Sequence, residues 1–217
     1  MIRVDSRKEP KFTQHYSQPE TYHFCHESVI LAETVVDRLP SSLPKDFRAL
    51  DIGAGCGVVG LELCHLKPEL PHVDFLEVQT EFEPHFRHNH KVAGRSNYPD
   101  RWLAASFSSL SNSNFESTYD LIVSNPPYFF EGEGPLGNDQ IRNRSRFFLD
   151  GSLEEMVRGI NSALKPFGAA YFLLRPGFRH GRDALEVVRG ALGPSASASL
   201  CAEIRGTWLI EIKKSNR

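Results

Sequence analysis

"LDIGAGCGVVGLEL", residues 50–63, begins as an apolar strand, passes through a glycine-rich loop and continues as an apolar helix. Glycines in such a loop let the backbone turn tightly and approach a ligand closely before the helix begins. In sheets built this way, ligands bind at the carboxyl ends of the strands. The stretch therefore predicts the first strand and helix of an α/β fold, with a ligand at the loop between them.

The rest of the chain repeats this alternation of short apolar runs and longer helical patterns. We expect strands at residues 47–52, 72–78, 101–105, 119–124, 168–174, 199–204 and 207–213. We expect helices at residues 26–39, 58–66, 83–93, 152–164 and 182–192, and a polar loop at 193–200. The sequence therefore predicts a mainly parallel sheet of seven strands with helices on both faces. Only Arg205 and Gly206 separate the last two strands, which predicts a hairpin and a final antiparallel strand.

The length and composition limit the class of protein. The chain of 217 residues is long enough for one α/β domain, so we expect a single domain over 1–217, with an N-terminal extension and helix at 1–46 and a core at 47–217. A net charge of -2 offers no global attraction for nucleic acid but allows local basic patches. The cysteines show no C-x-x-C spacing and the chain opens without an apolar signal region, which predicts a reduced, cytoplasmic protein. No apolar run approaches the ~20 residues that cross a bilayer, so we expect no membrane partner.

The glycine loop is compatible with two cofactors. Gly55, Gly57 and Gly60 satisfy the G-x-G-x-x-G pattern of dinucleotide enzymes, and Glu77 lies about where such an enzyme holds ribose hydroxyls. Asp51 favours S-adenosylmethionine, because a carboxylate before the loop repels a pyrophosphate and attracts an ammonium group. In that interpretation the loop amides face the methionyl carboxylate and Glu77 accepts both ribose hydroxyls. Alternatively, Asp51 caps the next turn and Glu77 is a solvated strand end.

A second motif, "LIVSNPPYFFEG" at residues 121–132, separates these alternatives. Pro126 and Pro127 fix two φ angles and remove two N–H donors, so Asn125 lies on a stiffened backbone at a strand end. If the Asn125 oxygen and the Pro126 carbonyl each accept one N–H of a planar amine, its lone pair points at a sulfonium methyl group. Tyr128 offers a flat face for stacking. We therefore predict methylation of an exocyclic or amide nitrogen, with Asn125, Pro126, Pro127 and Tyr128 as catalytic residues; the structural alternative is an edge turn.

These motifs resemble, in order, those of the S-adenosylmethionine-dependent methyltransferases that carry N-P-P-Y. The glycine loop is similar to their cofactor loop, "FLEVQTE" to their acidic second strand and "YDLIVSNPPYF" to their catalytic strand end. Within the group, "QPETYHFCHESVILAE" at 18–33 most resembles the segment before the cofactor fold of bacterial tRNA adenine N6-methyltransferases, which modify the adenine beside the anticodon of a valine tRNA. Gln18, Pro19, Tyr22, Phe24 and Glu27 match their pattern, with Glu27 where Asp is usual.

The resemblance implies a Rossmann-like methyltransferase fold, S-adenosylmethionine as cofactor and tRNA as partner. Ser106 stands where the family usually has an Asp that holds the adenine amine of the cofactor, so it can bond the ring only without a charge. The family also tends to carry a segment after its last strand, whereas this chain stops at "KKSNR", which leaves the particular RNA open. The cofactor-binding residues that the motifs and the resemblance predict are Asp51, Gly53, Ala54, Gly55, Gly57, Glu77, Val78, Ser106, Phe107 and Asn125.

Three arginines follow the N-P-P-Y motif at alternate positions, as on an extended strand or loop. Two interpretations are equally open: the arginines bind phosphates, or they lie in a solvated loop. Two aromatic residues that follow Tyr128 complete the surface on which we expect the substrate. The predicted substrate-binding residues are Phe129, Phe130, Arg142, Arg144 and Arg146.

Chain length separates the possible acceptors. A DNA adenine methyltransferase commonly needs a target-recognition domain, for which there is no room, and similar protein glutamine methyltransferases carry a helical domain ahead of the fold. An adenine exposed in RNA fits best, so we predict N6 methylation of adenine in tRNA and no DNA partner. The alternatives left open are a protein glutamine N5-methyltransferase, an rRNA guanine N2-methyltransferase and a catalytically silent RNA-binding module. His85, His88 and His90 lie at spacings that put them on different sides of a helix, so we predict a solvated helix face and no metal.

Overall fold

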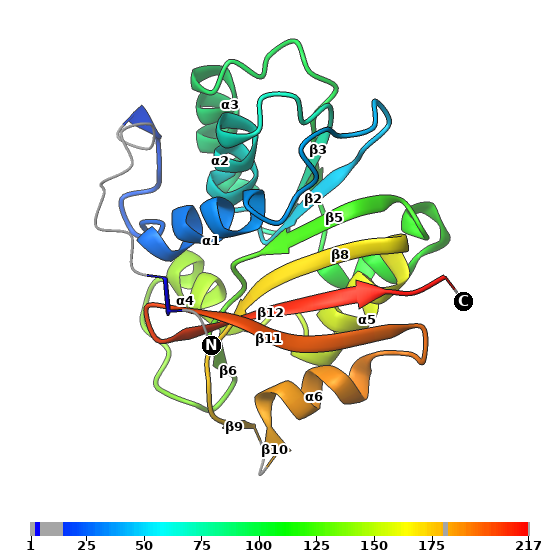
Figure 1. Cartoon of the computed structure of the whole chain (residues 1–217). Coiled ribbons are helices and arrows are strands. Elements are labelled where there is room, and N and C mark those ends of the chain that lie inside the picture. Colours follow the sequence, from blue (N-terminus) through cyan, green and yellow to red (C-terminus); the bar gives the residue numbers. More distant parts are fainter. Residues whose placement is uncertain (1–2, 5–14, 180–181, 217) are drawn as a thin grey trace.

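The computed structural model describes residues 3–4, 15–179 and 182–216. Eight strands form one sheet in the order β1-β11-β12-β8-β5-β2-β3-β4 (Figure 1). Neighbouring strands are parallel except at β12, which is antiparallel to both β8 and β11. The predicted mainly parallel sheet with a final antiparallel strand is confirmed, and the two-residue β1 is an additional strand. The strands are β1 Arg3–Val4, β2 Ala49–Ile52, β3 Val73–Glu77, β4 Arg101–Ala104, β5 Tyr119–Ser124, β8 Leu164–Leu174, β11 Ala196–Ile204 and β12 Thr207–Lys214.

Helices cover both faces of the sheet, as predicted (Figure 1). Alternate residues of a strand face opposite sides, so Leu121 and Val123 of β5 pack in one core cluster with the first helices, while Ile122 packs with the later ones. The helices are α1 His26–Val36, α2 Val58–Leu66, α3 Glu83–Val92, α4 Gln140–Arg146, α5 Leu153–Ala163 and α6 Ala184–Ala191. Short pieces complete the chain: the 3-10 helices Thr80–Phe82, Phe107–Ser111 and Ser113–Phe115, and the strand pairs β6 Phe129–Phe130 with β7 Phe147–Phe148 and β9 Phe178–Arg179 with β10 Arg182–Asp183.

The prediction of a polar loop at 193–200 is wrong, because β11 already begins at Ala196. Ala198 is buried while Ser197 and Ser199 are exposed, so this segment does alternate, with residues too small to give a strong apolar signal. Strand β8 also starts earlier than predicted, at Leu164, directly after α5. The predicted helix at 26–39 ends at Val36.

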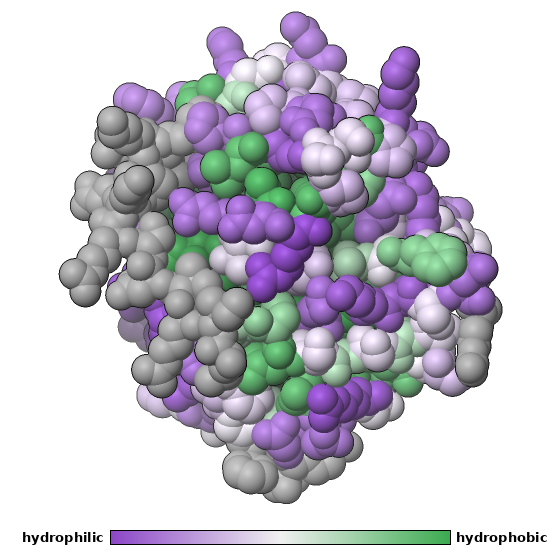
Figure 2. All heavy atoms as spheres, in the orientation of Figure 1, coloured by the Kyte–Doolittle hydropathy of each residue, from purple (hydrophilic) through white to green (hydrophobic). Residues whose placement is uncertain are grey.

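Strands β8, β12 and β11 have no helix in front of them in the view of Figure 1. The space-filling view shows hydrophobic residues on this side in patches that hydrophilic side chains interrupt (Figure 2). Among the described residues seen there, the apolar surface is therefore not continuous. Among the described residues, no helix combines the length and the apolar character that a bilayer crossing requires.

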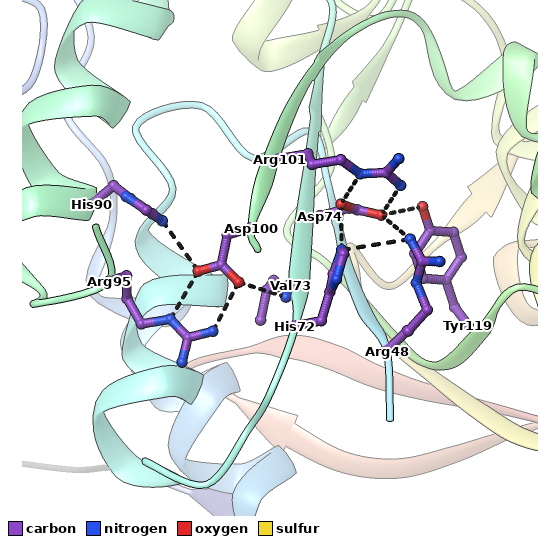
Figure 3. A network of polar contacts seen from close by, with 9 residues as sticks. All are labelled: Arg48, His72, Val73, Asp74, His90, Arg95, Asp100, Arg101 and Tyr119. Atoms are coloured by element: carbon purple, nitrogen blue, oxygen red, sulfur yellow. Dashed lines mark hydrogen bonds and ion pairs between the residues drawn. The ribbon is translucent and has the colours of Figure 1, made fainter. Parts of the chain in front are cut away.

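Two buried carboxylates stabilise the edge of the sheet where the strands begin (Figure 3). Asp74 accepts from Arg101 Nη2 at 2.6 Å, from Tyr119 Oη at 2.8 Å and from Arg48 Nη2 at 3.1 Å. His72 Nε2 lies 2.8 Å from the same carboxylate. These partners come from β4, β5 and the segments that enter β2 and β3, so one charge holds four strands together at their amino ends.

The second carboxylate, Asp100, accepts two hydrogen bonds of 2.8 Å from Arg95 and one of 2.9 Å from the Val73 amide. His90 Nε2 lies 3.1 Å from Asp100, and His85 Nδ1 lies 2.7 Å from Ser17 Oγ. The predicted solvated face is therefore wrong for these two histidines, which tie α3 to neighbouring segments. No group of three or more His, Cys, Asp or Glu side chains among the described residues is placed to hold a metal ion.

Candidate functional site

Strands β2, β3 and β5 end at one edge of the sheet. In the register, Ile52 lies opposite Leu76 on one side and Ser124 on the other. Ser124 Oγ donates to the Ile52 carbonyl at 2.8 Å, which ties the ends of β2 and β5 together. The segments that follow these residues, namely the glycine loop, Glu77 and Asn125, are thereby brought side by side.

A cavity of about 670 Å³, here called the inner cavity, lies at this edge. Apolar side chains form much of its wall, among them Ile52, Leu76 and Phe148. The predicted residues that line it are Gly53, Gly55, Glu77, Val78, Ser106, Phe107, Asn125, Pro126, Pro127 and Arg144.

Glu77 ends β3 with its carboxylate held at the inner cavity. Its Oε2 accepts from the Gly55 amide at 2.9 Å and its Oε1 from the Gln79 amide at 2.8 Å. Burial raises the pKa of Glu77, and these backbone donors oppose the shift only in part. The Val78 backbone is a third donor to this carboxylate, and because a carboxylate has about four acceptor positions, about one is left for a ligand hydroxyl.

The structure places Asp51 below the loop and outside the lining of the inner cavity. The side chain is 1% exposed, and its Oδ2 accepts from the Gly60 amide at 2.9 Å. Burial raises the pKa of Asp51 to about 7, the Gly60 bond lowers it and the neighbouring Glu77 raises it further. Asp51 therefore caps the start of α2, which was the alternative interpretation of this residue.

The loop amides also differ from the prediction that they face a ligand carboxylate. The amides of Gly53 and Ala54 donate to the Leu76 carbonyl at 2.8 and 3.1 Å, because the loop turns back over β3. Ala54 and Gly57 do not line the inner cavity and instead shape the loop. Gly57 has a φ of +85°, and a Cβ there would lie 2.7 Å from Phe86 Cδ2, so this position requires glycine.

A second cavity of about 990 Å³, the outer cavity, lies on the other side of Asn125 and Pro126. Four residues line both cavities: Tyr22, Asn125, Pro126 and Ser145. The rest of the outer cavity consists of Glu20, Thr21, His23, Cys25, Tyr128, Phe129, Arg142 and Arg146. The strand end of β5 therefore stands between an inner cavity with a largely apolar wall and an outer cavity lined by aromatic and basic side chains.

Asn125 has a defined orientation between the two cavities. Its Nδ2 donates to Ser28 Oγ at 2.9 Å and to Cys25 Sγ at 3.2 Å. Its Oδ1 is buried and has no hydrogen-bond partner among the described residues. The structure thus leaves one acceptor at the wall between the cavities, on the residue that the sequence predicts to accept a substrate N–H.

The aromatic residues after Asn125 divide between the two sides. Phe129 lines the outer cavity, with its ring 5.4 Å from that of Phe147, whereas Phe130 stacks on Phe148 at 5.0 Å. Tyr128 lines the outer cavity and packs against the core below it. Of the predicted aromatic set, Phe130 alone does not line the outer cavity, and its stacking partner Phe148 lines the inner cavity.

The prediction of an extended arginine segment is wrong, because Arg142, Arg144 and Arg146 lie on α4. Asp139 caps this helix by accepting from the Arg142 amide at 2.8 Å. Arg144 donates to Asp150 through Nε at 2.9 Å and Nη2 at 2.9 Å, on the side of the inner cavity. Arg142 and Arg146 are exposed and line the outer cavity, so the helix separates the three arginines into two groups.

Sequence reasoning missed the side chains that join these segments. Gln79 Nε2 donates to Ser145 Oγ at 3.1 Å and thereby connects the end of β3 to α4. Cys25 and Ser28 hold Asn125 from the start of α1. Tyr22, which lines both cavities, enters the sequence-based expectations only through the resemblance. No sequence motif predicts the contacts of Gln79 with Ser145 or of Asn125 with Cys25 and Ser28, because the partners are far apart in the chain.

The sheet order with an antiparallel β12, and a site at the carboxyl ends of β2, β3 and β5, define a Rossmann-like methyltransferase fold. The family described as "Methyltransferase small domain" matches residues 22–142. This chain belongs to that family.

The curated relatives carry one name. A tRNA1(Val) (adenine(37)-N6)-methyltransferase of Christiangramia forsetii is 29% identical over 169 residues, which cover 76% of this chain and 66% of the relative. One of Bacteroides fragilis is 34% identical over 127 residues, covering 56% of this chain and 49% of the relative. The chain thus spans between about half and two thirds of the length of these relatives.

Solved structures agree on the fold. The crystal structure of TrmN from Thermus thermophilus matches with a TM-score of 0.57 and 22% identity, over 86% of this chain and 48% of that one. The putative methyltransferase yhhF from Escherichia coli matches with a TM-score of 0.62 and 14% identity, over 93% and 92% of the two chains. The fold predicted from the sequence is therefore confirmed.

S-adenosylmethionine is the cofactor of this fold and family, and the inner cavity fits it. The Glu77 carboxylate can accept ribose hydroxyls, and Val78 and Phe107 provide apolar contacts for a planar ring. Ser106 lines the cavity, but its hydroxyl donates to the Asp150 carbonyl at 3.1 Å and its oxygen accepts from Ser108 N at 3.4 Å and Ser108 Oγ at 3.3 Å, so a bond to the ring would have to replace one of these contacts. Of the described side chains in the lining, Glu77 and Asp150 carry negative charge, and Arg144 pairs with Asp150, so Glu77 is the carboxylate left to favour a sulfonium cofactor.

Proposed function

We propose that this protein transfers the methyl group of S-adenosylmethionine to an exocyclic amine of an RNA base, with adenine N6 in tRNA as the acceptor. One observation carries the proposal: the unpartnered Oδ1 of Asn125 stands in the wall between the inner and outer cavities. A buried acceptor without a donor costs about 1 to 3 kcal/mol, so it is expected where a ligand N–H completes it. The names of the curated relatives support tRNA as the acceptor.

The exocyclic amine of a base is a poor nucleophile, because its lone pair is delocalised into the ring. Bound S-adenosylmethionine supplies a methyl group on a positively charged sulfur. Asn125 Oδ1 and the Pro126 carbonyl accept the two N–H groups of the amine, which turns its lone pair toward the methyl carbon. Transfer would exchange the S–C bond of the cofactor for a new N–C bond, and the same two acceptors would stabilise the positive charge that the nitrogen gains until one of its protons leaves to water. No strong base is needed, because that proton is acidic only after transfer begins.

The outer cavity supports an RNA base as the acceptor. Phe129 and Tyr128 offer aromatic faces, and stacking on a base is worth ~1 to 3 kcal/mol. Arg142 and Arg146 place two exposed positive charges beside these rings. An adenine exposed in a loop can enter such a space at low cost, with its phosphates near the arginines.

The test is methyl transfer with S-adenosylmethionine labelled in its methyl group. The protein is incubated separately with total RNA, DNA and ribosomal proteins from unmodified cells, and the labelled RNA is digested to nucleosides. We expect label in the tRNA fraction as N6-methyladenosine. Label in protein glutamine or in guanosine would redirect the proposal to those acceptors, and cofactor binding without any transfer would favour a silent RNA-binding module.

Glu77→Ala is expected to weaken binding of S-adenosylmethionine and of its demethylated product by ~1 to 3 kcal/mol, because charge-assisted ribose bonds are removed. Calorimetry measures both affinities. Glu131→Ala, which removes an exposed carboxylate away from the inner cavity, is the control and should bind both ligands like the wild type. Equal affinities in the two variants, or tight binding of NAD in place of the methionine cofactor, would contradict the assignment of Glu77.

Arg142→Gln combined with Arg146→Gln is expected to weaken binding of all RNA sequences alike and to reduce the salt slope by about 1 for each RNA phosphate that an arginine no longer neutralises. The affinity for S-adenosylmethionine should stay unchanged, since neither arginine lines the inner cavity. Arg144 is left in place because it pairs with Asp150. Arg158→Gln, which replaces an exposed arginine on α5, is the control. If the wild type, the double variant and the control show the same salt slope, Arg142 and Arg146 do not contact RNA phosphates.

A further inference from the structure

Two residues at the start of α1 determine which atom of Asn125 faces the acceptor. Ser28 is 5% exposed and lies in the first turn of α1, and Cys25 directly precedes the helix. They receive the hydrogen bonds of Asn125 Nδ2 at 2.9 and 3.2 Å. Because both contacts are made by the nitrogen, the oxygen of the same planar amide is the atom left without a partner among the described residues.

An asparagine amide has no strong intrinsic preference between its two flipped orientations, since its terminal torsion is broad and roughly two-fold. The two orientations exchange a donor for an acceptor at the same place. If Nδ2 faced the acceptor amine, two N–H groups would oppose each other, and the amine would have no side-chain oxygen of Asn125 to orient it. A hydroxyl can accept or donate, so Ser28 fixes the orientation only while its own proton has another acceptor, and Cys25 Sγ, 3.9 Å from Ser28 Oγ, is in place to take that proton. Ser28 Oγ then accepts from Nδ2 and is the nearer of the two partners of that nitrogen.

We propose that Ser28, assisted by Cys25, is a positioning residue for methyl transfer: it holds Asn125 with Oδ1 toward the acceptor nitrogen. This inference rests on the proposed function. Ser28 does not line either cavity, so it acts only through Asn125. It connects the N-terminal part of the chain to the reacting centre, because Ser28 and Asn125 are 97 positions apart and lie on α1 and at the end of β5.

Ser28→Ala tests the inference, and Thr34→Val is its matched control. Both remove one buried hydroxyl from α1, but Thr34 Oγ1 donates within the helix to the Ile30 carbonyl at 2.6 Å. In Ser28→Ala we expect kcat to fall about tenfold, the equivalent of about 1.4 kcal/mol, as the population of the productive orientation drops. The KM for RNA and the Kd for S-adenosylmethionine should stay within about twofold, because neither binding surface has changed. Thr34→Val should keep the wild-type kcat.

A double-mutant cycle asks whether Ser28 works through Asn125. In an Asn125→Ala background, Ser28→Ala should cause no further loss of kcat, because the amide that Ser28 positions is gone. A readout without turnover is the ¹⁵N-labelled side-chain amide signal of Asn125, identified as the one that Asn125→Ala removes. That signal should shift in Ser28→Ala and stay in place in Thr34→Val.

Three results would overturn the inference: a wild-type kcat in Ser28→Ala, a loss of kcat that persists undiminished in the Asn125→Ala background, or an Asn125 amide signal that does not respond to Ser28. The failure of the proposed function is distinguishable. If the wild-type protein transfers no methyl group to RNA, the proposed function fails, while the amide signal still reports whether Ser28 holds Asn125.

Discussion

Asn125→Ala is expected to slow methyl transfer to RNA by a factor on the order of 100 to 1,000, or ~3 to 4 kcal/mol, while the cofactor still binds. The substitution removes the acceptor that turns the amine lone pair toward the methyl group. It leaves Glu77 and its bonds to Gly55 and Gln79 in place, so the inner cavity stays formed. Single-turnover rates at saturating RNA, together with calorimetry of S-adenosylmethionine, separate the two effects. Asn112→Ala, an exposed asparagine, should leave both unchanged.

Asn125→Asp is the informative partner of this variant. A carboxylate keeps an accepting oxygen toward the amine, and Ser28 Oγ, which accepts from Nδ2 in the wild type, can donate to the other oxygen. We therefore expect partial activity in the Asp variant and almost none in the Ala variant. If both variants methylate RNA at the wild-type rate, N-P-P-Y forms only a turn in this protein and the proposed mechanism fails.

Much of the fold follows from the sequence because its strands are strongly apolar and its turns are marked. The run from Tyr119 to Ser124 is almost entirely buried, and Arg205 and Gly206 form the predicted hairpin between β11 and β12. The prediction for segment 196–200 is wrong, since alanine and serine give little contrast between the buried and the exposed face. Residues 140–146 form a helix that no apolar period predicts, because none of its residues is buried.

The site shows the same division between local and long-range information. The places of Glu77 and Asn125 after apolar strands predict their roles, and the structure brings both to the inner cavity. Asp51 follows the same logic but bonds Gly60 instead, because the backbone amide of a helix start is a nearer partner than a ligand. The contacts of Asn125 with Cys25 and Ser28 arise only when α1 packs beside β5, so no local pattern could reveal them.

The carboxylate of Asp74 makes further contacts that no sequence motif predicts. Of the proposed substitutions, its replacement should lower the free energy of unfolding most. Asp74 is fully buried, whereas Arg48 and Arg101 keep 32% and 51% of their side chains exposed. Burial by itself would raise the pKa of Asp74, but donors from Arg101, His72 and Tyr119 outweigh it and lower the pKa to about 2. The ionised form is therefore favoured by folding, and its contribution is present above the unfolded pKa of about 3.9 and disappears as the pH falls toward 2.

Asp74→Asn should lower the free energy of unfolding at pH 7 by about 3 kcal/mol, because the donors of Arg48, Arg101 and Tyr119 then meet a neutral amide that itself carries two N–H groups. We place the decrease near the lower end of the range for broken buried pairs, since Arg48 and Arg101 can turn toward water. Urea denaturation followed by circular dichroism measures it, with Glu83→Gln as control. Glu83 pairs with Arg87 on the exposed side of α3, so its removal should cost under ~0.5 kcal/mol.

The difference between wild type and Asp74→Asn should also shrink as the pH falls from about 4 toward 2, because the wild-type carboxylate then takes up a proton. A decrease at pH 7 no larger than that of Glu83→Gln would mean that the strands hold their amino ends together without this charge.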